Sequence, residues 1–495
     1  MVRGQPRSDC ARRLTTSADP GLSRRKALIR SLSDSLASQR DGWIARNSFF
    51  YESDFRYMKF LIAPGLRVLD LGVGTGQLLN ELRPAIGVGV DISPRMIDVA
   101  QCNYPHLDLR VGDIEDAAFV ASLPGPFDVI VLSDTIGSLD DCQSTLASLH
   151  CLCTPDTRIV VSYYSKLWEP VLSMAQRLSV KMPQAEQNVL PTQDIENLLF
   201  LADFETVKRE WRQLLPRRLL GIGTIVNRFI APFPIIRRAC LRSYLVARPK
   251  RTRAGTPTSA TVVIPCRNER GNIEDAVRRM PTFCDDLEIL FVEGHSTDGT
   301  LNEIRRVIAA YPHLNIKVLV QDGRGKGDAV RKGFTNASGD VLMILDADLT
   351  MPPEALPKFF DAIASEKGEF VNGSRLIYPV EKDAMRFLNY LANRLFSWVF
   401  TWLLNQRFTD TLCGTKVLRK KHFDSIAANR EYFGDFDPFG DFDLIFGASK
   451  ANLKMIEIPI TYGSRRYGET QISRFRHGML LIRMAGFAFR KLKTI

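Results

Sequence analysis

The 495-residue sequence has no CxxC pair among its nine cysteines and no cysteine spacing typical of a zinc site. It also lacks any apolar run that reaches the ~18 residues of a membrane-spanning helix. No signal peptide is evident in the polar, Ser/Arg-rich start of the chain. These absences favour a cytosolic protein without structural zinc. The length allows two or three domains, and the 45% hydrophobic content is ordinary for globular proteins.

Positive charge is concentrated in two segments of the chain. The net charge is +11, but residues 201–253 alone contain 13 Lys/Arg against 3 Asp/Glu. Residues 465–495 contain 8 Lys/Arg against 1 acidic residue, so the remainder of the chain is net acidic. Localised basic segments suit anionic surfaces such as membranes or nucleic acid.

The N-terminal half alternates predicted strands with helices, which predicts a mostly parallel sheet. The predicted strands are 68–71, 86–90, 109–114 and 127–133, and the last two strands, at 205–208 and 243–247, are expected to be antiparallel. Residues 211–242 form a basic, apolar insertion between these last two strands. We expect either a lid or membrane-facing helical hairpin there, or an ordinary pair of packing helices.

A glycine turn and two acids mark a ligand site in this half. Gly72, Gly74 and Gly76 follow the first strand, where glycine lets the backbone turn tightly and approach a ligand. Asp91 ends the second strand, where a carboxylate can take both hydroxyls of a ribose. Dinucleotide enzymes share these features, but here Asp70 precedes the glycines. An acid at that point repels a pyrophosphate and suits a cationic or amino-bearing ligand.

On these residues the N-terminal half, 50–248, resembles the class I S-adenosylmethionine-dependent methyltransferases. The resemblance implies that the methionine end, ribose and adenine of S-adenosylmethionine are held by Asp70, Gly72, Gly74, Gly76, Asp91, Asp113 and Ile114. Asp134 follows the fourth strand, where many relatives place substrate groups. The chain has no Asn-Pro-Pro-Tyr motif, so methylation of a base amino group has no support and we expect no nucleic-acid partner.

A linker and a second sheet follow. Residues 247–260 are basic and rich in Gly, Pro, Ser and Thr, which is typical of an exposed linker. Strands of a parallel sheet are predicted at 261–265, 288–292, 316–320 and 341–345. At its carboxyl edge this sheet presents a polar turn, an acidic turn, a basic glycine loop around Lys326, and a pair of carboxylates.

The carboxylate pair, Asp346 and Asp348, comes directly after the apolar run 341–345. Because side chains two apart on a strand point to one side, both carboxylates are expected to leave the sheet edge together. Mg²⁺ is usually held by one or two carboxylates plus substrate phosphates. A solvated loop, or a cap for the helix that begins near Glu354, is the alternative for this short motif.

The C-terminal half, 260–495, resembles the GT-A glycosyltransferases of family two, and especially the dolichyl-phosphate mannose and glucose synthases. The motifs that carry the resemblance are VVIPCRNERGNI, STDGT, GRGKGDAV, DADLTMPPE, DTLCGTKVL and EIPITYGSRRYGET. The resemblance implies a nucleotide-sugar site at Pro265, Arg267, Asn268, Glu269, Glu293 and Lys326. It also implies Mg²⁺ or Mn²⁺ on Asp346 and Asp348, with Arg375 and Arg466 facing phosphates.

The sequence departs from the family at two places. Glu293-Gly294-His295-Ser296 stands where Asp-Asp-Gly-Ser is common, which leaves the identity of the nucleotide open. Thr470-Gln471 stands where relatives often carry Ser-Lys.

The need for a general base depends on the sugar acceptor. A phosphate acceptor needs no general base, whereas a sugar hydroxyl needs one, and the candidates for that base are Asp410 and Asp441 or Asp443. Structural roles for these acids as loop hydrogen-bond acceptors are the alternative.

Two apolar segments bear on the acceptor. Residues 385–404 and 479–489 are apolar and aromatic, and basic residues flank the second. The apolar core of the first segment, 395–404, is too short to span a bilayer, and its aromatic residues suit the membrane interface. The alternative is that both segments are core helices.

The sequence thus predicts two tandem α/β domains: a flexible segment 1–49, a methyltransferase-like domain 50–248, a linker 249–259 and a GT-A domain 260–495. The expected function is sugar transfer from a nucleotide-sugar to a polyprenyl phosphate, at the inner face of an anionic membrane, with S-adenosylmethionine-dependent methylation. The alternative is a glycosyltransferase that acts on a saccharide hydroxyl, with a non-catalytic ligand-binding or scaffold module as its N-terminal half.

Overall fold

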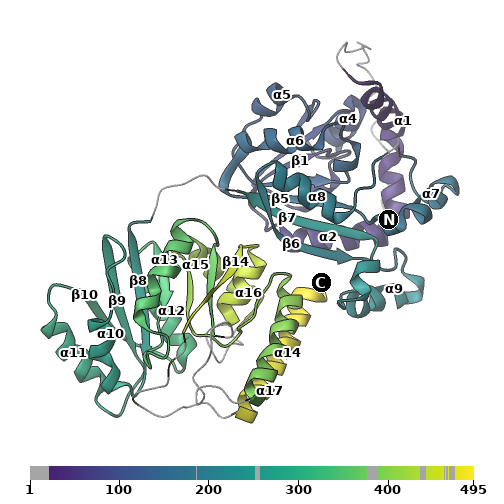
Figure 1. Ribbon diagram of the computed structural model, residues 1–495. Coiled ribbons are helices and arrows are strands. Elements are labelled where there is room, and N and C mark those ends of the chain that lie inside the picture. Colours follow the sequence, from purple (N-terminus) through teal and green to yellow (C-terminus); the bar gives the residue numbers. More distant parts are fainter. Residues whose placement is uncertain are drawn as a thin grey trace, which may run out of the picture. The chain divides into compact units, whose positions relative to one another are not determined.

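The computed structural model describes residues 22–184, 187–250, 257–375, 387–434, 442–461, 463, 467 and 474–495, with side chains undescribed at 387–393 and 474–478. The chain divides into two compact units, Met1–Lys250 and Arg251–Ile495. Each unit is built on a mixed seven-stranded sheet flanked by helices (Figure 1). The prediction of two α/β sheets in tandem is confirmed.

The first unit has the strand order β3-β2-β1-β4-β5-β7-β6. Its strands are β1 (Arg67–Leu71), β2 (Ile86–Asp91), β3 (Asp108–Val111), β4 (Phe127–Ser133), β5 (Cys153–Tyr164), β6 (Phe204–Arg212) and β7 (Arg242–Pro249). Its helices are α1 (Arg24–Arg46), α2 (Ser48–Leu61), α3 (Gln77–Glu81), α4 (Pro94–Asn103), α5 (Ala117–Ala121), α6 (Cys142–Ser148), α7 (Glu169–Arg177), α8 (Thr192–Leu201) and α9 (Ile222–Ile225).

The sheet is mostly parallel, as the sequence predicted. Strand β7 pairs antiparallel with both β5 and β6, so β6 runs in the same direction as the central strands. Strand β5 was not among the predicted strands, because its polar first residues hide the apolar run 159–161 that the sheet buries. The central strands are fully buried at Leu69, Val88 and Ile130, between helices on both faces.

Helix α1 corrects the prediction of a flexible segment over 1–49 for residues 24–46, while residues 1–21 lie outside the described residues. Residues 24–46 form this helix, and Ser23 caps its N-terminus, since the Ser23 hydroxyl accepts a hydrogen bond from the Lys26 amide. Its apolar residues recur at helical spacing, and Ile29, Leu32 and Leu36 line the pocket described below. The many serines and arginines around them hid this pattern in the sequence.

The second unit has the strand order β10-β9-β8-β11-β13-β12-β14. Its strands are β8 (Ser259–Cys266), β9 (Asp286–Glu293), β10 (Asn315–Val320), β11 (Val341–Ile344), β12 (Phe370–Ser374), β13 (Lys416–Arg419) and β14 (Met455–Pro459). Its helices are α10 (Ile273–Arg278), α11 (Thr300–Ala310), α12 (Lys326–Asn336), α13 (Leu356–Ala364), α14 (Phe387–Leu404), α15 (Lys420–Ala428), α16 (Phe442–Lys450) and α17 (Arg474–Ala488).

This second sheet is mixed rather than wholly parallel. Strands β8, β9, β10 and β11 are parallel to one another, but β13 pairs antiparallel with both β11 and β12. The four strands that the sequence predicted are parallel to one another, and β12 and β14 run in the same direction, so among the described strands of this sheet β13 is the antiparallel one. The strands beyond them are short and lie far along the chain from their partners, so their direction is decided by tertiary pairing.

Helices α14 and α17 lie side by side in the second unit (Figure 1). One side of the pair is packed, with Phe400 and Leu404 fully buried. Other side chains of the same helices are exposed: Leu395 at 60%, Trp398 at 58%, Met479 at 62% and Ile482 at 58%. Among the described residues, no helix combines the length and apolar character needed to cross a membrane. The two helices therefore combine a core role with an exposed apolar side.

Candidate active sites

A pocket of about 340 Å³ opens at the carboxyl ends of β1, β2 and β4 in the first unit. Open α/β sheets place their ligands at this edge. Five of the seven residues implied by the methyltransferase resemblance line the pocket: Asp70, Gly72, Asp91, Asp113 and Ile114. The other two glycines belong to the turn between β1 and α3. The structure therefore brings together residues that three separate segments contribute: 70–76, 91 and 113–114.

The three glycines of this turn all have positive φ angles, +87° at Gly72, +56° at Gly74 and +81° at Gly76. This conformation favours glycine because it has no Cβ. At Gly72 a Cβ would stand 2.3 Å from Thr135 Oγ1. The Gly74 amide donates to Asp91 Oδ2 at 2.9 Å, which ties the turn to the end of β2. The turn is therefore held in one shape by both its neighbours.

Asp70 is an unusual carboxylate for the end of a core strand. It is 2% exposed, and its Oδ1 atom has no hydrogen-bond partner among the described residues. Burial and the neighbouring Asp91 raise the pKa of Asp70 to about 7, and the Arg40 guanidinium opposes that rise. A buried acceptor without a partner, facing a pocket, fits a cationic group such as the amino group of S-adenosylmethionine.

Unlike Asp70 Oδ1, the carboxylates of Asp91 and Asp113 accept hydrogen bonds from neighbouring groups. Asp91 accepts hydrogen bonds from the amides of Gly74 and Ser93, both at 2.9 Å, and burial raises its pKa. Asp113 Oδ2 accepts from Lys26 Nζ at 2.6 Å. Each carboxylate oxygen can accept more than one hydrogen bond, so Asp91 still suits a ribose hydroxyl.

Helix α1 contributes two cations to this pocket that sequence reasoning missed. Lys26 pairs with Asp113 at 2.6 Å and with Glu115 at 2.9 Å. Arg40 lies against the glycine turn, since a Cβ at Gly74 would be 2.8 Å from its Nε. The helical spacing of Ile29, Leu32 and Leu36 could have revealed a helix in this segment, but no signal in the sequence placed it over the pocket.

A polar cluster lies at the other end of the pocket, beyond β4. Arg242 on β7 is 1% exposed and forms ion pairs with Asp54 at 3.1 Å and with Asp134. Tyr244 donates to Asp54, and the Tyr164 ring lies 4.9 Å from the guanidinium. The Asp134 side chain is 27% exposed and lines the pocket. This end of the pocket is therefore lined by polar and aromatic side chains.

In the second unit, the turns after β8 and β9 are joined by hydrogen bonds. The Asn268 amide donates to Ser296 Oγ at 2.9 Å, and Asn268 Oδ1 accepts from the Thr297 amide at 2.9 Å. Glu269 and Glu293 are buried, and Glu293 accepts from the Ser296 amide. These two acids shape the turns, whereas Arg267 is exposed and Pro265, within β8, is half-buried.

Lys326, at the start of α12, and Asp346, just after β11, form an ion pair at the carboxyl edge of the sheet. Lys326 Nζ lies 2.7 Å from Asp346 Oδ1, and both side chains are about one-third exposed, at 29% and 34%. A Cβ at Gly414 would stand 1.9 Å from Asp346 Oδ2, so only glycine lets that loop pass. Burial would raise the pKa of Asp346, but the charge and hydrogen bond of Lys326 outweigh it and lower that pKa.

The strand argument for the carboxylate pair is wrong. Strand β11 ends at Ile344, and Asp346 begins a turn in which its carbonyl accepts from the Leu349 amide at 3.1 Å. Asp348 Oδ1 accepts from the Thr350 amide at 3.1 Å and from its hydroxyl at 2.8 Å. The two carboxylates are therefore positioned by a turn rather than by strand alternation, and their joint metal binding stays a prediction.

Arg375 and Asp410 form a buried pair. Arg375 donates to Asp410 through its backbone amide at 3.0 Å, Nε at 2.7 Å and Nη2 at 2.8 Å. Asp410 is fully buried; burial would raise its pKa, but Arg375 outweighs it and lowers that pKa. Arg466, and with it Asp441, lies outside the described residues. Arg375 therefore holds a loop acid, and its role toward a phosphate stays a prediction.

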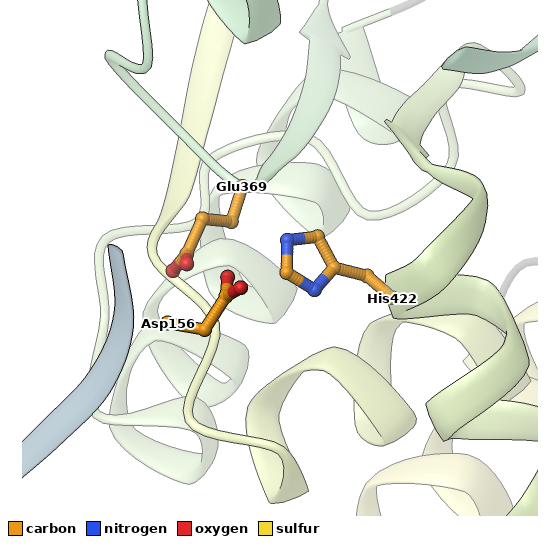
Figure 2. Close-up of side chains that lie close together, drawn as sticks. All are labelled: Asp156, Glu369 and His422. Carbon is orange, nitrogen blue, oxygen red and sulfur yellow. The ribbon is translucent and has the colours of Figure 1, made fainter. Parts of the chain in front are cut away.

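Glu369 and His422 are two buried polar side chains away from this sheet edge (Figure 2). Glu369 Oε2 accepts from the Lys454 amide at 2.8 Å, and the Glu369 amide donates to the Lys454 carbonyl. These bonds set the start of β12 against β14. Asp156, also drawn in Figure 2, belongs to the first unit, so no site is assigned to the three.

Comparison with known proteins separates the chain into the same two halves. A family described as "Methyltransferase domain" matches residues 38–209, and one described as "Glycosyl transferase family 2" matches residues 261–434. The chain is 30% identical over 218 residues to a dolichol-phosphate mannosyltransferase of Pyrococcus furiosus, which covers 43% of this chain and 58% of that protein. It is 27% identical over 229 residues to the dolichol-phosphate mannosyltransferase of Saccharomyces cerevisiae, covering 43% and 80%.

Solved structures resemble each half in turn. An S-adenosylmethionine-dependent methyltransferase of Thermotoga maritima covers 44% of this chain and 99% of its own, with 18% identity and a TM-score of 0.35. Glucosyl-3-phosphoglycerate synthase of Mycobacterium tuberculosis, solved with Mn²⁺ and uridine diphosphate, covers 48% and 80%, with 16% identity and a TM-score of 0.36. The chain is therefore an enzyme that carries a methyltransferase domain in its N-terminal half and a glycosyltransferase family 2 domain in its C-terminal half.

Proposed function

We propose that the C-terminal half transfers a sugar from a nucleotide-sugar to a polyprenyl phosphate, and that the N-terminal half methylates an acceptor with S-adenosylmethionine. The products would serve the synthesis of a cell-surface glycan or glycolipid. Two relatives at about 30% identity, both named dolichol-phosphate mannosyltransferase, support the first activity. Asp70, Asp91 and the glycine turn support the second.

The choice of a phosphate acceptor rests on the ion pair between Asp410 and Arg375. A sugar hydroxyl needs a general base to take its proton, whereas a phosphate monoester is already an anion. Asp410 is fully buried and locked to Arg375, which keeps its pKa low, so it is a poor base. The other described candidate, Asp443, is 9% exposed and lies 3.2 Å from Arg430 Nε. These contacts favour an acceptor that needs no base.

The donor site would be built from the turns after β8 and β9 and from the edge of β11. Lys326 begins α12 beside a glycine loop, where its ammonium and the helix N-terminus both attract a diphosphate. Asp346 and Asp348 offer the carboxylate oxygens that Mg²⁺ and Mn²⁺ prefer. A metal ion held there would neutralise charge on the diphosphate leaving group. Lys326 already forms an ion pair with Asp346, so binding of the donor and its metal ion would change the contacts between these two side chains.

The methyl-donor site would use residues of four segments. Asp70 would accept from the amino group of S-adenosylmethionine, and Asp91 would accept from its ribose. Bound S-adenosylmethionine supplies the activated methyl group. Helix α1 would keep water away from it, because Lys26 and Arg40 hold the helix over the carboxylates.

Membrane association would come in part from α14 and α17. Leu395, Trp398, Met479 and Ile482 are more than half exposed on these helices. Trp is enriched at membrane interfaces, and residues 465–495 are strongly basic. A polyprenyl phosphate is itself seated in a bilayer, so we place the reaction at the inner, cytoplasmic face of an anionic membrane.

A transfer screen tests the proposal. The chain is incubated with UDP-, GDP- and dTDP-sugars, with and without a short polyprenyl phosphate, and nucleotide release and glycolipid are measured. We expect release to depend on the polyprenyl phosphate for one donor. Asp348→Asn should lower transfer, and Asp424→Asn, an exposed acid on α15, is the matched control. Transfer to free saccharides in preference to the lipid phosphate would favour a hydroxyl acceptor and contradict the proposal.

The methyl-transfer half is tested separately. Calorimetry measures S-adenosylmethionine binding, and release of S-adenosylhomocysteine reports turnover in the presence of a membrane extract. We expect both. Binding without turnover under any condition would assign the N-terminal half to a ligand-binding or scaffold module.

A further inference from the structure

The pocket of the first unit has two different ends. The carboxylates of Asp70, Asp91 and Asp113 lie at one end. The other end, where Asp134 lies, is also walled by α7, the residues that follow it and the loop after β6, and the apolar part of this lining is Val171, Leu172, Ala175, Val180 and Pro216. A cavity of about 340 Å³ lies at the lower end of the range for a single small-molecule ligand. With S-adenosylmethionine bound, the bulk of a methyl acceptor must therefore extend outward past the apolar end.

Helix α7, at this apolar end, is amphipathic and contains no buried residue. Its apolar side chains are instead exposed, Val171 at 45% and Met174 at 58%, with Leu167 and Leu178 on its flanks at 69% and 67%. An amphipathic helix normally buries its apolar face in the protein core. Here the face is divided between the pocket wall and the surface, which is typical of helices that lie in a membrane interface.

The segment 214–239, between β6 and β7, extends this apolar surface. Its exposed apolar side chains are Leu219, Leu220, Ile222, Ile225, Phe229, Ile230, Phe233 and Ile235, with Leu220 fully exposed and Ile235 88% exposed. Such a density of exposed apolar residues marks an interaction surface.

The positive charge of this segment indicates which kind of partner the apolar surface binds. Residues 211–241 contain no acidic residue, and Arg217, Arg218, Arg228 and Arg238 are exposed among the apolar side chains. Apolar side chains interleaved with arginines complement a leaflet that carries anionic lipid headgroups. A purely protein-binding apolar patch has no need of this uniform positive charge.

Hydrogen bonds hold this apolar surface in place next to the pocket. Asn227 clamps the segment, since its side chain accepts from the Leu215 amide at 2.9 Å and donates to the Leu215 carbonyl at 2.7 Å. Trp168, just before α7, donates to the Ala239 carbonyl at 2.8 Å, which holds α7 beside the end of the segment. Arg217 lies both in the segment and in the pocket lining. The apolar surface and the pocket mouth are therefore continuous.

We infer that the methyl acceptor is an amphiphile seated in an anionic lipid leaflet. Its polar end enters the pocket toward Asp134 and its apolar chain leaves between α7 and the segment 214–239. The inference rests on the proposed methyl transfer and adds the class of its acceptor. The exposed apolar surface of the first unit is then the place where the chain meets the membrane during methylation.

Hydrogen exchange of the full chain tests the contact directly, with phosphatidylcholine vesicles that contain or lack phosphatidylglycerol. We expect residues 167–178 and 214–239 to become protected only when phosphatidylglycerol is present. Unchanged exchange in both segments would overturn the inference, whether or not methyl transfer exists. Protection without vesicles that rises with protein concentration would assign the surface to a second copy of the chain and overturn it as well.

A transfer assay tests the acceptor class. Labelled S-adenosylmethionine is supplied with a membrane extract in phosphatidylglycerol-containing vesicles, and label is measured in organic and aqueous phases. We expect label in the organic phase, lowered about tenfold or more by Leu220→Ser with Ile235→Ser, because two exposed anchors are lost. S-adenosylhomocysteine affinity should not change. The matched control, Leu201→Ser with Ile86→Ser, alters exposed residues elsewhere on the unit and should transfer normally.

Two outcomes of this assay separate the inference from the proposed function. Label that appears in the aqueous phase, or a Leu220→Ser, Ile235→Ser chain with undiminished transfer, overturns the lipid acceptor while methyl transfer stands. Absence of S-adenosylmethionine binding overturns the proposed methyl transfer itself, and the inference with it.

Discussion

Replacing Asp70 by asparagine should make the first unit more stable and its S-adenosylmethionine site weaker. The carboxyl is 2% exposed, and burial with the neighbouring Asp91 raises its pKa from 3.8 to about 7. The folded unit therefore favours the protonated, neutral form, which asparagine imitates. At neutral pH the wild-type chain must ionise this group inside the fold, and a pKa difference of that size corresponds to about 4 kcal/mol.

The pH dependence fixes the sign of the effect. Below the unfolded pKa of 3.8 the carboxyl is neutral in both states, so wild type and Asp70→Asn should differ little in stability. As pH rises, the unfolded state releases its proton first, and wild type loses stability relative to the variant. The gap should level off above pH 7, where the folded state is also ionised.

Denaturation measured across this pH range tests the reasoning. The transition of the first unit is identified as the one that S-adenosylmethionine raises, and at about 2–4 °C per kcal/mol the variant should melt roughly 10 °C higher near pH 7.5. Calorimetry should show S-adenosylmethionine affinity lowered by about 1–3 kcal/mol, since a buried charged acceptor is gone. Asp98→Asn, an exposed acid on α4, is the control. The reasoning that Asp70 is a buried, unpaired carboxylate would be refuted by a destabilised Asp70→Asn chain. It would also be refuted if the difference in stability between wild type and variant did not change with pH.

Four further outcomes follow from the same structure. Asp348→Asn should keep the fold and lower sugar transfer by about 10²–10³; EDTA should abolish wild-type transfer until Mg²⁺ or Mn²⁺ is added, and full activity in EDTA would exclude the metal. Asp410→Asn should destabilise the second unit by about 3–5 kcal/mol in urea denaturation, because it leaves Arg375 with a buried uncompensated charge. Asp322→Asn breaks an exposed pair and should change stability by about 1 kcal/mol or less; equal effects would contradict the buried pair. Residues 254–495 expressed alone should fold and retain sugar transfer; a folded but inactive product would mean that the halves share a site. Flotation should show binding to anionic but not neutral vesicles, released by salt at about 1 kcal/mol per basic residue, and equal indifference to both would count against membrane association.

The sequence by itself determined that the chain contains two α/β sheets, and it located most of their parallel strands. The strands at β1, β2 and β4 were predicted to within a residue, because they are short, mostly apolar segments followed closely by glycine or an acid. Strands β1, β2 and β3 place Asp70, Asp91 and Asp113 at one sheet edge, since parallel strands end together. Family matches over 38–209 and 261–434 confirm the recognition that these local motifs supported.

Only the tertiary structure decided how the remaining residues act. Helix α1 is separated by dozens of residues from the carboxylates that it covers, so no local pattern joins Lys26 to Asp113. Asp346 and Asp348 lie in a turn because β11 ends one residue earlier than its apolar run. Asp410 is paired with Arg375 because the end of β12 meets the loop that leads into β13, its neighbour in the sheet. Side chains that meet only through packing of distant segments leave no periodicity in the sequence, which is why these roles could not be predicted from it.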